Sequence, residues 1–321
     1  MKIFSGTRPS GELHIGNYLG AISNWMELQD KNDCIFSVVD YHAITTPYEK
    51  EKFHQRNLEM VAWLIACGID PEKTRLFRQS QVPEHTELAW ILSTVLPVSE
   101  LFRMTQYKEK STDQSKENIS AGLLNYPILM AADILIYDAD TIPVGEDQVQ
   151  HVELARIIAR KFNHRYGKIF TEPKTILTKT KRVMSLKDPT KKMSKTGADG
   201  IALGDSSVII TQKIMSAVTD TGEAGKISPA VKNLFGLVEA FGEPEKMAEF
   251  IQAIENKTIQ YVELKRYLAE KIIEKLIPIQ KKYQEIMAKP DKIEQTLTNN
   301  AQALRKEAQE KIEKVKKEMG F

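Results

Sequence analysis

The chain has 321 residues, 42% of them hydrophobic, and its 45 Lys and Arg against 43 Asp and Glu give a formal net charge of +2. This length and apolar content are enough for one large or two moderate domains with a proper core. The near-even charge excludes a global polycation that would attract nucleic acid over its whole surface, so any anion site must be a local concentration of charge.

The two cysteines, Cys34 and Cys67, are too few for a disulfide scaffold and show neither CxxC nor Cys/His ligand spacing. We therefore expect reduced core thiols and no structural zinc or iron–sulfur cluster. The N-terminal stretch MKIFSGTRPSG reaches glycine before a secretory apolar region could form, and no window holds about 18 apolar residues in a row. These features predict a cytoplasmic protein that does not enter a membrane.

Short β-branched runs alternate with helical patterns over the first half of the chain. The runs that we predict to be strands are KIFSG at 2–6, CIFSVVD at 34–40, RLFRQS at 75–80 and TIPVG at 141–145. One of the intervening helical patterns ends at WLIACGID, where Gly68 can supply the C-terminal cap. This alternation predicts an α/β fold with a parallel sheet covered on both faces, whose ligands bind at the C-terminal ends of the strands.

Beyond about residue 200 the strand patterns largely stop and helical periodicity takes over. Pro244, Pro278 and Pro290 punctuate this part, which we expect to be an all-helical domain. The segment 291–321 holds seven Lys and Arg and six Asp and Glu, a mixture typical of a solvated helix face.

The first stretch that suggests chemistry is GTRPSGELHIGNYLG, which follows the first predicted strand. A strand, a glycine-bearing loop and a helix N-terminus together can hold an anion, because free backbone N–H groups and the helix dipole point at it. Gly16 would let a flat ligand approach the backbone, and His14 and Asn17 add side-chain donors. The spacing is neither GxGxxG nor a phosphate loop. Phosphate binding and an ordinary turn in which His14 caps the helix are both compatible with it.

A second stretch, residues 179–195, concentrates positive charge. It holds seven Lys and Arg against the single Asp188. An exposed basic loop of this kind is often only a soluble loop. However, Lys192 and Lys195 flank a hydroxyl and two glycines follow them, which suits a flap that closes over a polyphosphate. Such a flap would bring ammonium groups to the charge that builds up on a departing pyrophosphate.

The third stretch is NYPILMAADILIYDAD, in which we expect Pro127 to lie in the first turn of a helix. Four side chains share one face of this otherwise apolar helix: Tyr126, Met130, Asp133 and Tyr137. A carboxylate there is costly unless something donates to it. An internal ion pair or backbone contact would meet that need. So would a ligand, if the aromatic ring and the methionine shape an apolar slot in which Asp133 accepts one hydrogen bond.

Two further strand ends carry polar residues. PVGEDQVQH ends a strand with glycine and starts a helix with Glu146, Asp147 and Gln148. Acidic residues in a first helical turn are ordinary dipole partners, although a carboxylate at this place can equally bind ribose hydroxyls or an ammonium. His42, in VVDYHAIT, lies at a third strand end, and a histidine there is more often structural than functional.

Together and in this order, these stretches resemble the class I aminoacyl-tRNA synthetases, and the match is closest to the bacterial tryptophan-specific members. HIGN at 14–17 is similar to the family's HIGH motif, and KMSKT at 192–196 is similar to its KMSKS motif. YPILMAADIL, PVGEDQVQH and RVMSLKDPTKKMSK are similar to signatures that separate the tryptophan members from the tyrosine members. The resemblance covers nearly all of residues 1 to about 200 and rests on length and pattern over the helical remainder.

The resemblance implies a Rossmann-like catalytic domain at 1–188, a mobile KMSKT loop at 189–200 and a helical anticodon-binding domain at 201–290. The C-terminal helix at 291–321 could then pack back towards the catalytic domain.

The implied ATP site has three parts. The residues that line it near the N-terminus are Arg8, Pro9, Ser10, Gly16 and Asn17. Those that would hold the adenosine are Gly145, Glu146 and Asp147, with Val183 beside the base. The mobile loop on the phosphates would consist of Lys192, Met193, Ser194, Lys195 and Thr196.

For tryptophan, the resemblance implies that Asp133 accepts the indole N–H. The residues around the ring would be Phe4, Tyr126, Met130 and Val144, with His42 and Gln148 near the amino-acid backbone. Three positions depart from the family pattern: Arg8 stands where many members have glutamine, Asn17 replaces the last histidine of HIGH, and Thr196 replaces a serine. Asn keeps a donor and Thr keeps a hydroxyl, whereas Arg8 adds a charge near the phosphates.

The implied reaction is tryptophan activation by ATP followed by transfer to tRNA(Trp). His14, Lys192 and Lys195 would be the catalytic side chains, and Mg²⁺ would be held mainly by the ATP phosphates rather than by protein ligands. The implied partners are L-tryptophan, tRNA(Trp) and a second copy of the chain in a homodimer, and neither a membrane nor DNA. The alternatives are a tyrosine-specific relative, disfavoured by MAADIL and GEDQVQH, and a non-catalytic RNA-binding paralogue, disfavoured by the joint presence of the catalytic residues and Asp133.

Overall fold

A computed structural model of the chain describes residues 1–112, 120–177, 183–193, 200–219 and 227–321. The chain divides into two compact units, each built from segments that are distant in sequence. Unit 1 consists of Met1–Ser10, Trp25–Thr178 and Lys289–Phe321, and unit 2 consists of Gly11–Asn24 and Lys179–Ala288.

Unit 1 is built on a five-stranded parallel sheet with the strand order β3-β2-β1-β4-β5. Its strands are β1 (Lys2–Thr7), β2 (Asp33–Val38), β3 (Arg75–Arg78), β4 (Thr141–Val144) and β5 (Lys174–Leu177). The predicted α/β class with a Rossmann-like parallel sheet is confirmed. The sequence does not predict β5, because its residues are largely exposed at the edge of the sheet and lack the apolar run that marks the other strands.

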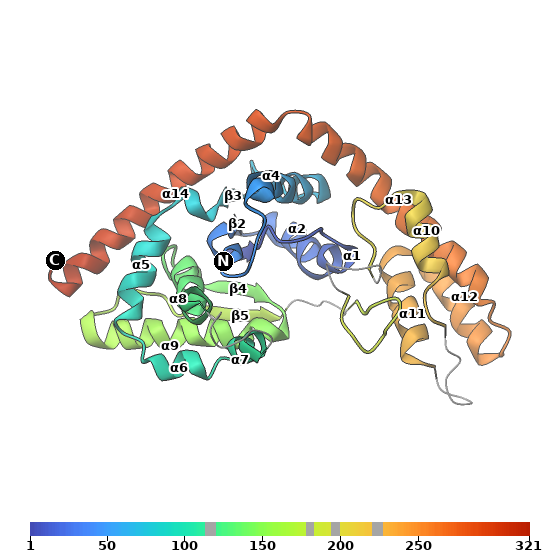
Figure 1. Cartoon of the computed structure of the whole chain (residues 1–321), viewed down its shortest axis with the longest axis horizontal. Helices are drawn as coiled ribbons and strands as arrows, with labels where there is room; N and C mark the ends of the chain where they lie inside the picture. Colours follow the sequence, from blue (N-terminus) through green and yellow to red (C-terminus); the bar gives the residue numbers. More distant parts are fainter. Residues whose placement is uncertain (113–119, 178–182, 194–199, 220–226) are drawn as a thin grey trace. The chain divides into compact units, whose positions relative to one another are not determined.

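Helices surround this sheet (Figure 1). The helices of unit 1 are α2 (Ser23–Gln29, which begins in unit 2), α3 (Asp40–Ala43), α4 (Lys50–Cys67), η2 (Gln79–Gln81), α5 (Glu84–Ser93), α6 (Val98–Phe102), α7 (Thr105–Thr112), α8 (Ala121–Leu135), η4 (Glu146–Gln148), α9 (Val149–Tyr166) and α14 (Pro290–Met319). Gly68 caps α4 as predicted, at a φ of 121° that favours glycine.

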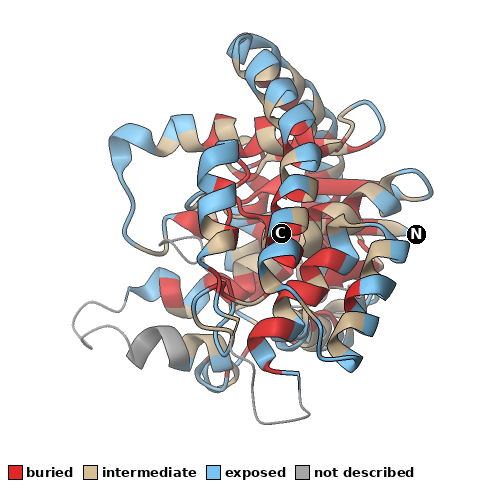
Figure 2. Cartoon of the chain, turned by 90° about the vertical axis from the view of Figure 1, so that its right-hand side faces the viewer, coloured by how far each residue is buried: buried red, intermediate tan, exposed pale blue. Residues whose placement is uncertain are grey.

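The core of unit 1 lies between the sheet and these helices. Figure 2 shows the strands largely buried. Phe36, Phe77 and Tyr137 are fully buried, and the Trp25 ring stacks on Phe36 with 4.6 Å between centroids. These large side chains account for much of the apolar area that holds the sheet in place.

The start of α8 differs from the prediction. The helix begins at Ala121, with the Ser120 side chain as its N-cap, so Pro127 lies in the helix interior and not in the first turn. Proline has no N–H, so one hydrogen bond to the preceding turn is missing there. Asp133 lies in the last turn of α8, and Tyr137 follows just after its end.

The long helix α14 packs within unit 1, against β3 and α5. The Asn300 side chain donates to the Leu76 carbonyl oxygen of β3 at 3.0 Å. Arg305 pairs with the buried Glu84 at the start of α5 at 2.9 Å, and Glu307 accepts from Arg75 at 2.8 Å. The charge run of this helix is therefore divided between a face turned to solvent and pairs that attach it to the sheet.

Unit 2 joins the segment after β1 to a helical group, in which α10 to α13 gather (Figure 1). Its helices are α1 (Ile15–Asn17), the π-helical turn η1 (Tyr18–Ile22), α10 (Ser207–Met215), α11 (Pro229–Phe241), α12 (Pro244–Glu255) and α13 (Tyr261–Met287). Lys265 of α13 is buried and donates to the carbonyl oxygens of Met215 and Ala217, at 3.2 and 2.7 Å. It thereby satisfies the C-terminal end of α10, where carbonyl groups lack helical partners.

Candidate active site

The carboxyl ends of β1 and β4 bring two of the predicted segments to one edge of the sheet in unit 1. The residues that follow β1 are Arg8, Pro9 and Ser10, and those that follow β4 are Gly145, Glu146, Asp147 and Gln148. The two strands are neighbours, and β2 and β3 continue the sheet on one side while β5 continues it on the other. This is the point of an open α/β sheet at which ligands bind.

Both segments are tight turns. The Ser10 N–H donates to the Arg8 carbonyl oxygen at 2.8 Å. Gly145 precedes η4, and a Cβ at this position would lie 2.8 Å from Asp147 Oδ1, so glycine leaves room for that carboxylate. Asp147 and Glu146 are exposed, and Gln148 donates to Asp147 Oδ2 at 2.9 Å. The turn after β4 thus presents carboxylates to solvent at the ligand edge of the sheet.

Asp133 is 1% exposed and is bound by three side chains. His42 Nε2 lies 2.9 Å from Oδ2, and His85 Nδ1 lies 2.5 Å from Oδ1. Gln79 Nε2 donates to both oxygens, at 2.8 and 2.9 Å. Burial alone would raise the pKa of this carboxyl, but the hydrogen bonds from His42 and His85 outweigh it, so the pKa is lowered from its ordinary value. Asp133 is therefore held as a carboxylate.

The donors to Asp133 come from consecutive strand ends. His42 lies on α3, just after β2, and Gln79 begins η2, directly after β3. Asp40 connects the two turns, because its carboxylate accepts from the Ser80 N–H at 2.9 Å and from the Ser80 hydroxyl at 2.5 Å. The parallel sheet sets these turns side by side, and α8 brings the carboxylate to them.

Tyr137 extends this network into the core. Its hydroxyl lies 2.7 Å from His85 Nε2, and its ring stacks with Phe4 of β1 at 6.2 Å between centroids. Burial, and then the charge of Asp133, raise the pKa of the Tyr137 hydroxyl well above its ordinary value. The hydroxyl therefore stays protonated.

Tyr126 connects α8 to α9 and to His42. Its hydroxyl lies 2.9 Å from His151 Nε2, and its ring meets His42 edge-on at 6.3 Å between centroids. Of the residues expected around tryptophan, the structure thus joins His42, Tyr126 and Asp133 through direct contacts and Phe4 through Tyr137. Val144 is buried at the end of β4, and Met130 and Gln148 are half-buried on α8 and η4.

The HIGN segment lies in unit 2, where His14 caps α1. Its Nδ1 accepts from the Gly16 N–H at 3.1 Å, and its own N–H donates to Asn17 Oδ1 at 3.1 Å. With Nδ1 as the acceptor, the ring proton resides on Nε2, which makes Nε2 the donating atom. A Cβ on Gly16 would lie 2.9 Å from the imidazole of His14. The glycine is therefore what allows this histidine to fold back over the helix start.

The described part of the basic segment lies beside HIGN in the same unit. Met184 and Lys192 form an antiparallel bridge, and the Met193 N–H donates to the Val183 carbonyl oxygen at 3.0 Å. Val183 Cβ lies 3.6 Å from the position of a Cβ on Gly16. The structure thus brings together the predicted residues His14, Gly16, Asn17, Val183, Lys192 and Met193. Three further predicted residues, Ser194, Lys195 and Thr196, lie outside the described residues.

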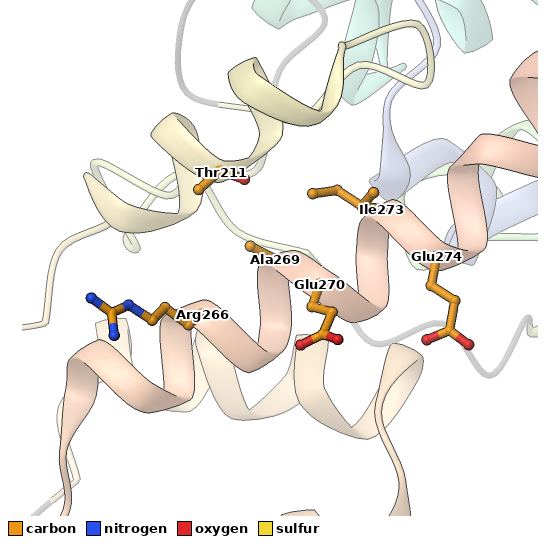
Figure 3. Close-up of a pocket in the computed structure, with 6 residues that line it drawn as sticks. All are labelled: Thr211, Arg266, Ala269, Glu270, Ile273 and Glu274. Atoms are coloured by element: carbon orange, nitrogen blue, oxygen red, sulfur yellow. The ribbon is translucent and has the colours of Figure 1, made fainter.

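Unit 2 also carries an open hollow of about 410 Å³ between α10 and α13. Figure 3 shows Thr211 on α10 and the other lining residues on α13: Arg266, Ala269, Glu270, Ile273 and Glu274. None of the predicted site residues lines it, and we give it no part in the site.

The described residues offer neither a cluster suited to a metal ion nor a helix suited to crossing a membrane. They contain no group of three or more His, Cys, Asp and Glu side chains placed to hold a metal ion. None of the helices formed by these residues combines the length and the apolar composition that crossing a bilayer requires.

Sequence reasoning missed Gln79 and His85 as members of the site. Gln79 could have been found as a polar residue at the carboxyl end of a predicted strand. His85 carries no such signal, since a single histidine in the first turn of a helix has no characteristic spacing, and only the fold brings it to Asp133.

The chain matches the model of a family described as tRNA synthetases class I (W and Y) over residues 1–277. A tryptophan–tRNA ligase from Wolinella succinogenes is 42% identical over 324 residues, which cover 100% of this chain and 98% of that protein. One from Clostridium tetani is 44% identical over 328 residues, which cover 99% and 95%. The crystal structure of tryptophanyl-tRNA synthetase from Campylobacter jejuni complexed with ADP and tryptophan is 35% identical, with a TM-score of 0.86 and 100% of both chains covered.

Proposed function

We propose that the chain is a tryptophan–tRNA ligase. It belongs to the class I tRNA synthetases for tryptophan and tyrosine. It activates L-tryptophan with ATP to tryptophanyl-adenylate and diphosphate, and then transfers the acyl group to the 3′ end of tRNA(Trp), releasing AMP. The tryptophan–tRNA ligases at 42% and 44% identity over the whole chain support tryptophan as the substrate.

The observation that carries this choice of substrate is the buried carboxylate of Asp133. An indole N–H is a donor that such an acceptor can bind. Phenylalanine offers no side-chain donor, so its rejection by roughly four orders of magnitude is attainable without an editing step. Tyrosine does offer a donor, so the shape of the slot must exclude it. We assign the walls of the slot to Phe4, Tyr126, Met130 and Val144, and the amino-acid backbone to His42 and Gln148.

In the first step, the tryptophan carboxylate attacks the α-phosphorus of ATP and pyrophosphate leaves. No side-chain nucleophile is needed, so the protein acts by holding the reactants in line and by stabilising charge on the phosphates. We assign that role to His14, Lys192 and Lys195. Gly16 lies close to Val183, whose carbonyl oxygen accepts from the Met193 N–H, and this supports a nucleotide site shared by the two motifs.

The remaining nucleotide contacts are assigned by family motif. They are Arg8, Pro9, Ser10, Asn17, Gly145, Glu146, Asp147, Met193, Ser194 and Thr196, with Gly16 and Val183. Mg²⁺ would be carried mainly by the ATP phosphates, whose oxygens are ligands of the kind it prefers.

We assign anticodon recognition to the helical region 201–290, the catalytic domain to 1–188 and the mobile loop to 189–200. Charging of tRNA serves protein synthesis, so we place the enzyme in the cytoplasm.

We further propose a homodimer formed through the catalytic domain. Unit 1 exposes large apolar side chains on neighbouring helices, Trp90 on α5 and Val98 and Phe102 on α6, which supports a contact there. Gel filtration at micromolar concentration giving the mass of one chain, 36.5 kDa, would count against the dimer.

The direct test is amino-acid-dependent ATP–pyrophosphate exchange with the purified chain and no tRNA. We expect exchange with tryptophan and a preference for tryptophan over tyrosine of several orders of magnitude. Exchange that favours tyrosine would overturn the substrate. The absence of exchange with either amino acid would leave only the RNA-binding alternative.

A further inference from the structure

The acceptor proposed for the indole is already surrounded by protein donors. Each oxygen of Asp133 has two contacts, His85 and Gln79 on Oδ1, and His42 and Gln79 on Oδ2. A carboxylate offers about four lone-pair positions, so an added donor must share or replace one of these contacts. Which side chains stay in place therefore decides how Asp133 meets its ligand.

Two of the three donors are completely enclosed. Gln79 and His85 are both 0% exposed, whereas His42 is 8% exposed. His42 lies on a short helix and meets Tyr126, a proposed wall of the slot, edge-on. Of the three donors His42 alone has exposed surface, so we take its contact to Oδ2 to be the one that a ligand replaces.

The ring of His85 is fixed from both ends. Tyr137 keeps its proton and can donate it to His85 Nε2 at 2.7 Å, so the proton of the imidazole resides on Nδ1, which faces Asp133 Oδ1 at 2.5 Å. Phe77 meets the same ring at 5.7 Å between centroids. His85 can neither turn away nor present a lone pair to the carboxylate without breaking a buried contact.

The orientation of the Gln79 side chain is fixed by its place in the turn after β3 and by the charge of the Asp133 carboxylate. Its amide nitrogen must face Asp133, because the amide oxygen would be repelled by the carboxylate. That oxygen, Oε1, has no hydrogen-bond partner among the described residues, so the bonds to Asp133 are what orient the side chain. The next residue, Ser80, is bound to Asp40, which prevents the turn from moving away from the slot.

We propose that Gln79 and His85 are positioning residues for substrate selection: together they hold the Asp133 carboxylate turned so that Oδ2 receives the indole N–H in exchange for His42. The inference rests on the proposed function. Neither side chain touches the reacting atoms. Their effect passes through Asp133 and should appear only with an amino acid that donates to it.

The test compares L-tryptophan with benzothienylalanine, an analogue of the same shape in which sulfur replaces the indole N–H. KM and kcat in pyrophosphate exchange are measured for both amino acids with the wild-type chain, His85→Leu, Gln79→Met and the conservative His85→Asn. We expect each donor-removing substitution to raise KM for tryptophan by roughly tenfold or more, the usual value of one charge-assisted hydrogen bond. KM for the analogue should change much less, so the preference for tryptophan falls. His85→Asn keeps an N–H near the Nδ1 position and should recover part of that preference.

A packing control separates positioning from loss of structure. Leu88, one turn after His85 on α5, is fully buried and makes no hydrogen bond to Asp133. We expect Leu88→Ala to lower thermal stability and to change KM for both amino acids by the same factor. If His85→Leu does not fold, Gln79→Met and His85→Asn carry the comparison.

The outcomes are distinct. An unchanged tryptophan preference in both His85→Leu and Gln79→Met would overturn the positioning role while leaving the enzyme's function intact. A wild-type chain that accepts the two amino acids equally well would overturn the role of Asp133 itself. A wild-type chain without tryptophan-dependent exchange would overturn the proposed function.

Discussion

Replacing Gly16 by alanine should separate catalysis from stability. The added Cβ would lie 2.9 Å from both Nδ1 and Cε1 of His14, whereas ordinary contacts begin at about 3.4 Å. The ring is held by its bond to the Gly16 N–H at 3.1 Å, so it cannot retreat by half an ångström and keep that bond. We expect His14 to turn away from the helix start.

The magnitudes for Gly16→Ala follow from the N-cap that His14 makes and from the phosphate contact proposed for it. Loss of the N-cap costs about 1 kcal/mol, and replacing glycine by alanine in a helix returns about 1 kcal/mol, so the free energy of unfolding should change little. Loss of one positioned donor to the phosphates costs about 3 kcal/mol of transition-state stabilisation, or roughly a hundredfold in kcat. The substitution should therefore give a folded, nearly inactive enzyme.

The assay is pyrophosphate exchange at saturating tryptophan and ATP, with urea unfolding of the same samples. Gly236→Ala is the matched control, because a Cβ at that position on α11 meets nothing within 4 Å. It should keep full activity and gain up to about 1 kcal/mol. A Gly16→Ala enzyme with kcat within threefold of the wild type would refute the reasoning, as would an unfolded one.

Three further predictions concern buried polar groups. The pKa of Asp133 is lowered in the folded chain, so its contribution to stability is complete above its ordinary pKa of about 4 and is lost as the pH falls through the lower folded value; acid unfolding followed by circular dichroism should be less steep for Asp133→Asn than for the wild type. Lys265→Met leaves two carbonyl oxygens at the end of α10 without their donor, and should lower the urea-derived free energy of unfolding by about 1–3 kcal/mol; no change would show that water replaces the ammonium without cost. Burial, and then the Asp33 charge, raise the pKa of the Cys34 thiol to about 11, so iodoacetamide at pH 8 should label this residue only after unfolding, as mass spectrometry can show.

The strands β1 to β4 could be predicted because each is a short apolar run, and the pleated, buried sheet requires such runs. Strand β5 could not, since an exposed edge strand does not need them. The periodicity predicts the helix of Asp133 but places its start too late, since the helix begins at Ala121. Proline favours a first turn in general, whereas here Ser120 supplies a stronger start signal and the packing of α8 accommodates the proline.

The candidate site could be predicted from the sequence only in part. Asp133 stands out in the sequence because a charge in an apolar helix must have partners. The identity of those partners depends on which strand ends adjoin, and the strand order cannot be derived from one sequence. His85 and Gln79 become visible only when the order β3-β2-β1 sets their turns beside α8.

The attachment of α14 to the sheet has a consequence for biosynthesis. The hydrogen bond from Asn300 to Leu76 joins residues 224 positions apart. Ribosomes add about 5–20 residues per second, so β3 emerges many seconds before the helix that covers it. During that interval the strand has an uncovered edge, which is where sheets associate wrongly with other chains. The nascent chain is therefore exposed to aggregation from the time β3 emerges until α14 has been made.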